Sequence, residues 1–514
     1  MADIKANPEG AKAASTTDIA LGELHNIKKD FQSDDIAARV LASSTDNFEY
    51  TPAEGRTVLR KIDTRLLPMM MVTYCIQFLD KACVAYAALW GMKVDANLVG
   101  SQYSWLTTIF YIGYLVGEFP MNYLFQKFSL TRVCGISIFC WGVVLLCMTA
   151  ANDFKGLMVS RFLLGFFEGG VSPCFVLLTG MFYKREEQPL RNGIWFSTNG
   201  IANIAGALIG YAIGFINSDL PAWKFPFVIW GSVTTLWGIV FMLYVPPNPI
   251  QAKWLTEREK IIAVVRIASN ETGLDTTTFK WYQVREAMTD VKVWMLILIT
   301  FSNNVPNGGV SAFGPLIING FGYTKFESTL LNMPTGACQI AALWISGYLA
   351  SKYKGFRIIL MGGGLCVAIL GASLVYALPT SQRIGRLIGN YILIGWSVTY
   401  VLLLGLIQSN IAGRTKKTVV TASLFVSYCV GNLIGPQFFF DREAPRYSSG
   451  FISMLACLIG QLVLVVILYF MYDIENRRRD RLQLTTSESL SEDNMELAFA
   501  DLTDKENIHF RYIL

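Results

Sequence analysis

Long apolar stretches alternate with short polar connections over most of the chain. Stretches of spanning length lie at about 66–90, 101–125, 133–151, 157–182, 191–216 and 224–246, and six more lie at about 291–318, 327–351, 357–378, 384–410, 418–440 and 450–472. Each provides the ~20 residues that a bilayer-crossing helix needs. The pattern predicts an all-α membrane protein with twelve transmembrane helices in two six-helix halves.

The polar segments divide the chain into five regions. We predict a cytoplasmic N-terminal tail (1–64), an N-terminal half (65–246), a cytoplasmic middle loop (247–290), a C-terminal half (291–472) and a cytoplasmic C-terminal tail (473–514). In the middle loop, AKWLTEREKIIAVVRIASN alternates apolar and charged residues at helical spacing, which predicts an amphipathic helix on the membrane surface. The C-terminal tail carries RRRDR (Arg477 to Arg481) before an acidic Ser/Thr stretch, which predicts membrane-surface anchoring followed by disorder.

Lysine and arginine are distributed unequally between the two sets of connections. Twenty-six of them lie on the side shared by both chain ends and eight on the other side. Because cytoplasmic loops carry the excess of these residues, both termini are predicted to be cytoplasmic, and we expect a multi-pass protein of the plasma membrane.

Composition excludes several classes of protein. The chain is 53% hydrophobic and 16% charged, whereas soluble domains are roughly 25% charged, so a soluble multidomain enzyme or a nucleic-acid-binding chain is excluded. The ten cysteines lie in apolar runs without CxxC pairs, which indicates buried small side chains rather than zinc or disulfide sites. The two histidines, His25 and His509, lie in the polar ends. Proton chemistry in the membrane must therefore use carboxylates, and no metal or catalytic residue is predicted.

The two halves resemble each other. NYLFQKFSLTR (Asn122 to Arg132) after the second helix and GYLASKYKGFR (Gly347 to Arg357) after the eighth share Tyr, Leu, Lys, an aromatic residue and Arg at an offset of 225 residues. Transporters built from such repeats bind their substrate near the midplane between the halves.

Four charged residues interrupt the apolar helices. Asp80 and Lys81 are adjacent in the first helix, and Arg161 and Glu168 lie seven residues apart in the fourth, close to two turns and so on one face. A charge at the bilayer centre costs roughly 2.5–3.5 kcal/mol even on the lenient insertion scales. Helix direction and the rise of 1.5 Å per residue place Asp80 and Lys81 at a depth between those of Arg161 and Glu168, so we predict that two acids and two bases meet in one cavity.

These residue types indicate an anion site coupled to protons. Lys81 and Arg161 can receive an anion, with arginine offering a bidentate fork to a carboxylate. Asp80 and Glu168 can take up protons, and protonation of one acid releases its basic partner to hold the anion. The rival interpretation is a static salt-bridge cluster that fixes helix packing.

At these residues the sequence resembles the major facilitator superfamily, specifically the fungal, allantoate-permease-like branch of its anion:cation symporter family. The resemblance covers about residues 55–475 and rests on QFLDKACVAYAAL (Gln77 to Leu89), RFLLGFFEGGVSPCF (Arg161 to Phe175), EQPLRNGIWFSTNG (Glu187 to Gly200), FGPLIINGFGYT (Phe313 to Thr324), NMPTGA (Asn332 to Ala337), AGRTKK (Ala412 to Lys417) and GNLIGP (Gly431 to Pro436). It implies the major facilitator fold and symport of a small organic anion.

The resemblance also implies roles for single residues. An acidic–basic pair on the first helix and an Arg–Glu pair on the fourth couple protons to substrate in such relatives, and these positions are Asp80, Lys81, Arg161 and Glu168 here. A substrate-contacting amide of the sugar-acid carriers aligns with Asn199. Lys81 departs from the arginine of those carriers, and a lysine offers a point charge instead of a planar fork. The loop motif G-x-L-x-D-R is also degraded, with Asn122 and Gln126 in place of Gly and Asp.

Other polar residues are weaker candidates. Asn303 and Asn304, with Asn307, flank Pro306 in the seventh helix, a composition typical of a broken helix that lines a cavity. We add Trp396, Tyr400 and Asn432 as substrate-binding candidates. Near the inner helix ends we expect gating roles for five residues: Glu118, Lys127, Arg132, Lys352 and Arg357.

Three hypotheses for function remain open at this point. The first is proton-coupled import of a small organic carboxylate such as a ureide, a vitamin or a related acid, by a monomer that uses the proton gradient and no cofactor. The second is a proton-antiport exporter of a metabolite or drug, although helix five lacks the Gly-Pro antiporter signature. The third is a nutrient sensor that binds without transport.

Overall fold

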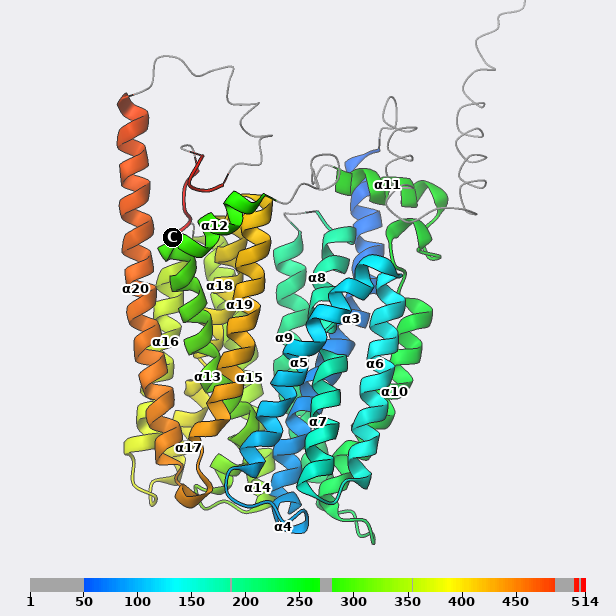
Figure 1. Cartoon of the computed structure of the whole chain (residues 1–514), viewed down its shortest axis with the longest axis vertical. Helices are drawn as coiled ribbons and strands as arrows, with labels where there is room; N and C mark the ends of the chain where they lie inside the picture. Colours follow the sequence, from blue (N-terminus) through cyan, green and yellow to red (C-terminus); the bar gives the residue numbers. More distant parts are fainter. Residues whose placement is uncertain (1–49, 185–186, 269–279, 354, 486–502, 508–509) are drawn as a thin grey trace, which may run out of the picture. The chain divides into compact units, whose positions relative to one another are not determined.

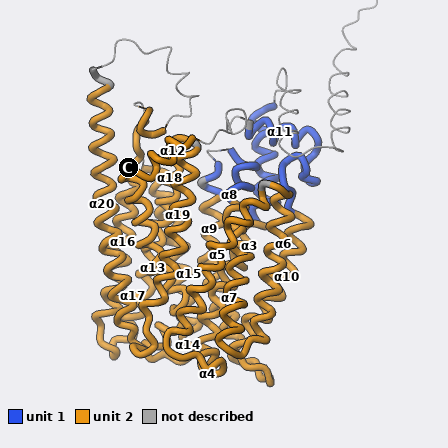
Figure 2. Tube along the Cα trace, viewed as in Figure 1, with its two compact units in different colours: residues 1–68, 176–191, 245–277 blue, residues 69–175, 192–244, 278–514 orange. Residues whose placement is uncertain are grey.

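The computed structural model describes residues 50–184, 187–268, 280–353, 355–485, 503–507 and 510–514, which form helices and no β-strand. Two compact units divide the chain: residues 1–68, 176–191 and 245–277 form unit 1, and residues 69–175, 192–244 and 278–514 form unit 2 (Figure 2). The predicted N-terminal tail up to residue 49 and the acidic stretch within 486–502 lie outside the described residues.

Twelve helices or helix pairs in the described residues have spanning length, which confirms the predicted fold class (Figure 1). They are α3 (Pro52–Leu89), α5 (Gln102–Lys127), α6 (Leu130–Cys147), α7 (Phe154–Glu168) with α8 (Val171–Phe182), α9 (Gln188–Ile213), α10 (Phe225–Tyr244), α13 (Val291–Asn319), α15 (Met333–Lys352), α16 (Arg357–Ala377), α17 (Arg383–Leu393) with α18 (Trp396–Asn410), α19 (Arg414–Ile434) and α20 (Ser448–Thr485). Both α3 and α20 extend beyond the predicted apolar stretches because hydropathy marks only the part of a helix that meets lipid.

Glycines bring α5 and α7 into backbone contact. Gly113 and Gly117 on α5 and Gly165 and Gly169 at the end of α7 are each spaced by four residues, and a Cβ at any of them would overlap the backbone of the other helix. Such small-residue stripes allow helices in lipid to approach closely. The contact fixes the part of α7 that carries the predicted charged residues against α5, which lies beside it in Figure 1.

The two halves meet on the side of the protein where α4 (Met92–Asp95) lies, and we call this the outer side. The inner side is the one where α5 ends and α13 begins, and it is predicted to be cytoplasmic. Lys93 Nζ on α4 lies 2.8 Å from Asp441 Oδ1 in the connection between α19 and α20. The Tyr103 hydroxyl donates to the Ala312 carbonyl at 2.6 Å, and the Thr108 hydroxyl donates to the Leu433 carbonyl at 2.9 Å. These contacts close the outer side.

We expect the Lys93→Ala variant to open the outer side more often. The pair is partly exposed, and pairs of this kind contribute about 0.2–1 kcal/mol, so the population of outward-open molecules should rise by up to about fivefold. The measurement is labelling of an Ala312→Cys reporter by a membrane-impermeant thiol reagent. Lys325→Ala, which removes another lysine of the outer side, is the control, and equal labelling rates in both variants would contradict the assigned role.

Unit 1 is held together by ion pairs around α11 (Glu257–Ala268). Arg266 lies 2.7 Å from Glu187, and Lys61 lies 2.6 Å from Glu259. The helix predicted in the middle loop is confirmed, but its apolar residues Ile262 and Ala263 are buried inside the protein. The predicted position on the membrane surface was therefore wrong, since amphipathic spacing cannot distinguish a lipid partner from a protein partner.

Two stretches of the C-terminal segment, residues 503–507 and 510–514, are bound to the inner ends of the C-terminal half. The wholly buried Lys416 Nζ lies 2.7 Å from Asp504, 2.9 Å from Glu286 and 3.1 Å from Asp290. Tyr512 stacks on Tyr472 with ring centroids 4.7 Å apart. Glu286 belongs to α12 (Trp281–Thr289), so the segment ties the end of the middle loop to α19.

The predicted membrane anchoring of the RRRDR segment was wrong for Arg479. Its guanidinium is buried and donates to the carbonyls of Asp504 and Phe510, both at 2.8 Å. Arg477 and Arg478 pair with acids of their own helix, Asp473 and Glu475. A run of arginines at a helix end is equally typical of a membrane anchor and of a protein contact, and only the folded structure distinguishes the two roles.

We expect Lys416→Met to lower the melting temperature by about 5 °C or more, because removing one partner of a buried ion pair costs about 3–5 kcal/mol. Lys417→Met, its neighbour, is the control, and equal melting temperatures would contradict the role of Lys416.

Burial raises the pKa of Asp290, but the Lys416 ammonium outweighs this and holds that pKa below its ordinary value of 3.8. A lowered acid pKa stabilises the folded form above the ordinary pKa, so protection of the segment from hydrogen exchange should persist down to about pH 4 and be lost below it.

Candidate functional site

An ion pair between α3 and α7 lies at the centre of the candidate site. Lys81 Nζ is 2.8 Å from Glu168 Oε1, and the Glu168 side chain is fully buried while that of Lys81 is 21% exposed. The Lys81 ammonium also lies over the rings of Phe110 and Tyr114 on α5, 5.7 Å and 5.4 Å from their centroids. Cation–π contacts with desolvated rings add to the stability of the cation in this position.

Arg161, two turns before Glu168, carries an unused hydrogen-bonding edge. The side chain is 2% exposed, and its Nε and Nη2 atoms have no hydrogen-bond partner. These two donors form the edge of a guanidinium that binds a carboxylate in bidentate fashion. Arg161 and Lys81 line one cavity together with Val84, Thr107, Phe110, Tyr111, Ser311 and Ala312. Two cations, three hydroxyl groups and apolar walls are the groups that recognise a small organic anion, and the cavity of about 20 Å³ between them has room for a water molecule as it stands.

Asp80 turns away from this cavity. It is fully buried, and its Oδ2 accepts hydrogen bonds from the indole of Trp141 on α6 and, at 3.0 Å, from the hydroxyl of Thr234 on α10. Its Oδ1 has no partner. Of the four predicted charged residues, Lys81 and Arg161 line the cavity, Glu168 pairs with Lys81, and Asp80 lies on the other face of α3 because consecutive helix residues point about 100° apart.

Aromatic rings form a continuous layer next to this site, which we call the aromatic layer: Tyr74, Tyr114, Phe196, Tyr400, Phe425 and Tyr428. Phe196 on α9 lies 5.8 Å from Tyr400 on α18, and Tyr400 lies 5.8 Å from Tyr428 on α19. Tyr114 stacks on Phe425 at 5.6 Å. The layer therefore joins the two halves, and Tyr400, a predicted substrate-binding residue, belongs to it.

Two further predicted residues are buried with unused polar atoms. Asn199, on the same helix as Phe196, is 8% exposed and its Oδ1 has no hydrogen-bond partner. Trp396 is 6% exposed, and its indole Nε1 has no partner either. Unsatisfied buried groups are costly, so both are candidates for contact with a polar ligand.

The predicted break in the seventh helix was wrong, because α13 is continuous through Pro306, and its asparagines bond to protein groups. Asn303 accepts from Gln461 on α20 at 2.9 Å, while its own Nδ2 has no hydrogen-bond partner. Asn432 donates to Asn304 at 3.1 Å and accepts from Asn307 at 2.7 Å, which links α13 to α19. An offset of 225 residues places Asn303 close to the repeat position of Asp80, so each half carries a buried polar contact at this point of its first helix.

The five predicted gating residues do not form one cluster. Arg357 donates to the Ser409 hydroxyl at 3.0 Å, which joins α16 to α18. Lys127 and Lys352 are exposed and lie over the tyrosine rings of their own segments, and Arg132 is exposed at the start of α6. Glu118 is half-buried on α5, one turn from Tyr114.

Sequence reasoning missed the partners that define the site. Trp141 and Thr234 hold Asp80, and Phe110, Tyr111 and Tyr114 surround Lys81. Aromatic residues at i, i+1 and i+4 beside Gly113 were the available signal on α5. In an apolar helix, however, tyrosines are equally typical of packing against lipid or other helices.

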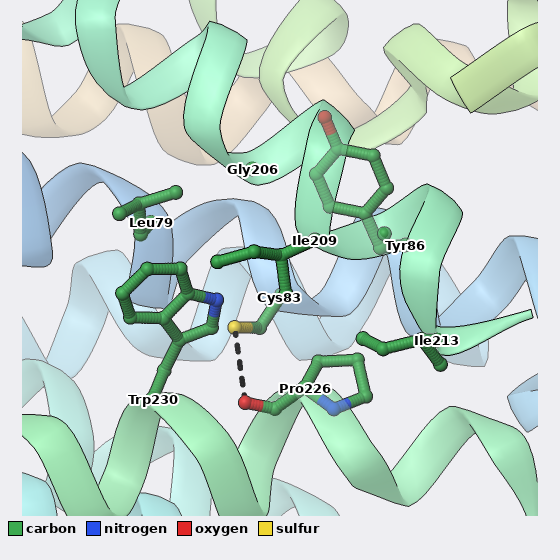
Figure 3. A pocket seen from close by; sticks show the side chains of 9 residues that line it. Leu79, Cys83, Tyr86, Gly206, Ile209, Ile213, Pro226 and Trp230 are labelled. Atoms are coloured by element: carbon green, nitrogen blue, oxygen red, sulfur yellow. Dashed lines mark hydrogen bonds between the residues drawn. The ribbon is translucent and has the colours of Figure 1, made fainter. Parts of the chain in front are cut away.

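A second cavity lies between α3, α9 and α10, around Cys83, whose thiol donates to the Pro226 carbonyl at 3.8 Å (Figure 3). Leu79, Tyr86, Ile209, Ile213 and Trp230 are among its lining residues. None of the residues that line it carries a charge, whereas the cavity around Lys81 and Arg161 has cationic walls.

Comparison with known proteins gives consistent results. The family profile described as Major Facilitator Superfamily matches residues 70–436. An uncharacterized transporter of Schizosaccharomyces pombe, C757.13, is 41% identical over 93% of this chain and 91% of its own. The allantoate permease of Saccharomyces cerevisiae is 36% identical, and the thiamine pathway transporter THI73 of the same yeast is 34% identical, each over 93% of this chain and 90% of its own.

Solved structures share the fold. A D-xylose–proton symporter superimposes with a TM-score of 0.60 at 11% identity, covering 78% of this chain and 96% of its own. A bacterial homologue of the human lysosomal transporter Spinster, in an inward-facing and occupied conformation, gives a TM-score of 0.59 at 16% identity, covering 79% of this chain and 96% of its own.

Proposed function

Since this chain belongs to the Major Facilitator Superfamily and is a transporter rather than an enzyme, we propose that it carries a small organic carboxylate together with protons across the plasma membrane. The proton gradient drives uptake by alternating access, and no cofactor takes part. Both termini face the cytoplasm, in agreement with the excess of lysine and arginine on the inner side.

The unused Nε–Nη2 edge of Arg161 carries this proposal. A buried guanidinium with two unsatisfied donors is costly unless a ligand completes it. A carboxylate supplies two acceptors in the geometry of that edge. The hydroxyls of Thr107, Tyr111 and Ser311 line the same cavity and can bind further oxygen atoms of the substrate.

The neighbouring ion pair couples binding to protons. While Glu168 is ionised, it neutralises Lys81. When Glu168 takes a proton from the outer side, the Lys81 ammonium loses its partner and attracts the substrate anion. Asp80 is a second candidate acid, whose buried carboxyl lies on another face of α3 and is bonded by Trp141 and Thr234. Substrate and proton then enter the site together, and each stabilises the binding of the other.

The names of two relatives support a small organic substrate. The allantoate permease is named for a ureide carboxylate, and THI73 is named for the thiamine pathway. Lys81 provides a point charge beside aromatic rings, so selectivity among carboxylates should depend on the fit of the substrate body to Phe110 and Tyr111 more than on a second bidentate contact.

A thermal-shift screen of the purified protein against a panel of carboxylates, with allantoate included, tests the substrate class. A ligand at about 100 times its Kd stabilises the folded protein by about 2.7 kcal/mol. We expect at least one carboxylate to raise the melting temperature, by more at about pH 5.5 than at about pH 7.5 because protonated Glu168 favours binding. Stabilisation by neutral amides of the same shape but not by the acids would contradict the proposal.

A further inference from the structure

We infer that Glu118 on α5 accepts the proton from Glu168 and releases it to the inner side. The inference rests on the proposed function, in which Glu168 is the acid that loads with a proton. It assigns the exit of that proton to the glycine-lined contact between α5 and the α7–α8 helix pair.

Two hydroxyl groups that bond to each other stand next to the two acids in the helices that carry them. The Tyr114 hydroxyl donates to the Ser172 hydroxyl at 3.2 Å, across the contact between α5 and α8. Ser172 lies four residues after Glu168, and Glu118 lies four residues after Tyr114. Glu118 therefore lies about one helical turn beyond Tyr114 on α5, and Ser172 lies at the start of α8, directly after the break that follows Glu168; both steps run toward the inner side.

The close helix contact keeps these groups together. Gly169 follows Glu168 directly, and a Cβ there would lie 3.3 Å from the backbone nitrogen of Glu118. Gly170 similarly lies against Met121. The inner part of α5 and the start of α8 are thus held side by side where Glu118 stands.

The group that faces Glu118 from α19 is the Cys429 thiol. The ion pair of Lys81 and Glu168 belongs to the neighbouring parts of α3 and α7. α6 packs against α5 one turn beyond Glu118, where the Ser137 hydroxyl lies 3.9 Å from the sulfur of Met121. In the described part of the chain no salt bridge is formed by Glu118, and the residue is half-buried, so its carboxyl can exchange protons with inner water.

The transfer balances as a single proton movement. The O–H bond of the Glu168 carboxyl breaks, the proton passes along the Tyr114 and Ser172 hydroxyls and water, and an O–H bond forms on Glu118. The Glu168 carboxylate re-forms its ion pair with Lys81, which expels the substrate anion from the cation. Glu118 then gives its proton to water on the inner side and returns to the carboxylate.

The test separates net symport from exchange in proteoliposomes that contain the full-length protein. Net uptake of radiolabelled allantoate under a pH gradient needs proton release, whereas exchange of labelled for unlabelled allantoate does not. We expect Glu118→Gln to slow net uptake at least about tenfold, in the range of one lost proton-transfer group, and to change exchange by less than about twofold. Glu118→Asp should restore most of the net rate, and Glu257→Gln on α11 is the control.

Two outcomes would overturn the inference: net uptake by Glu118→Gln at the wild-type rate, or an equal fall of net uptake and exchange, which would assign Glu118 to the conformational change. If the wild-type protein moves no allantoate in either assay, allantoate is not its substrate, and the role of Glu118 is then tested by a measurement that needs no substrate. Infrared difference spectra of the protein in lipid between about pH 5 and pH 8 should show a carboxyl band that Glu118→Gln lacks and Glu257→Gln keeps. Identical spectra for the wild type and Glu118→Gln would overturn the inference.

Discussion

The Glu168→Gln variant will bind carboxylate without accumulating it. Glutamine is neutral like the protonated acid, so Lys81 stays available to the substrate at all pH values, and binding should lose its pH dependence. Because the variant carries no proton, a pH gradient should not drive net uptake. The rate of proton-driven uptake should therefore be lower than that of the wild type by about 100-fold or more. Uptake of radiolabelled allantoate in proteoliposomes with and without a pH gradient provides the measurement.

Glu187→Gln is the matched control for this variant. Glu187 is also an acid paired with a basic residue, Arg266, but it belongs to unit 1 and not to the cavity. Proton-driven uptake by Glu168→Gln at a rate close to that of Glu187→Gln would contradict the assignment of the coupling proton to Glu168.

The Arg161→Lys variant will lose affinity for the substrate while it keeps the charge. Lysine cannot present two parallel donors from separate nitrogens to one carboxylate. Removing a buried charged hydrogen-bond partner costs about 2–5 kcal/mol, which corresponds to roughly 30- to several-thousand-fold in Kd. Isothermal titration with allantoate, or with the carboxylate that stabilises the protein most in the thermal-shift screen, provides the measurement.

Arg386→Lys controls for the general cost of changing a buried arginine. Arg386 on α17 is 2% exposed, lies over the ring of Phe321, and also has an unpartnered nitrogen. It does not line the cavity of Lys81 and Arg161. Equal losses of affinity in the two variants would show that Arg161 acts through stability alone.

The fold followed from the sequence because lipid imposes a simple rule. A spanning helix must be long and apolar, and each of the twelve apolar stretches corresponds to a helix or a helix pair in the structure. The break between α7 and α8 at Gly169 and Gly170 was not predicted, since glycines in a spanning helix are also typical of close packing.

The charged residues of the site were visible because charges are rare in these helices. Lys81, Arg161 and Glu168 come together as the spacing of Arg161 and Glu168 suggested. Asp80 could not be placed, because its direction depends on Trp141 and Thr234 from helices that the sequence pattern does not orient. Helical spacing tells which residues share a face but not which neighbour that face meets.

The C-terminal segment shows the same limit at longer range. Its contact with Lys416 joins residues 88 positions apart, and three acids from separate segments converge on one ammonium. The periodicity of the sequence does not predict such a contact, since each of these residues is an ordinary charged residue of a polar connection.

The most direct test of the central claim is to measure proton movement caused by the substrate itself. Proteoliposomes with a pH-sensitive dye inside and equal pH on both sides receive allantoate, or the carboxylate selected by the thermal-shift screen, on the outside. Coupled transport predicts acidification of the interior as the anion enters, at least one proton per carboxylate, and no acidification with Glu168→Gln. Entry of the carboxylate into wild-type liposomes without acidification would contradict the account.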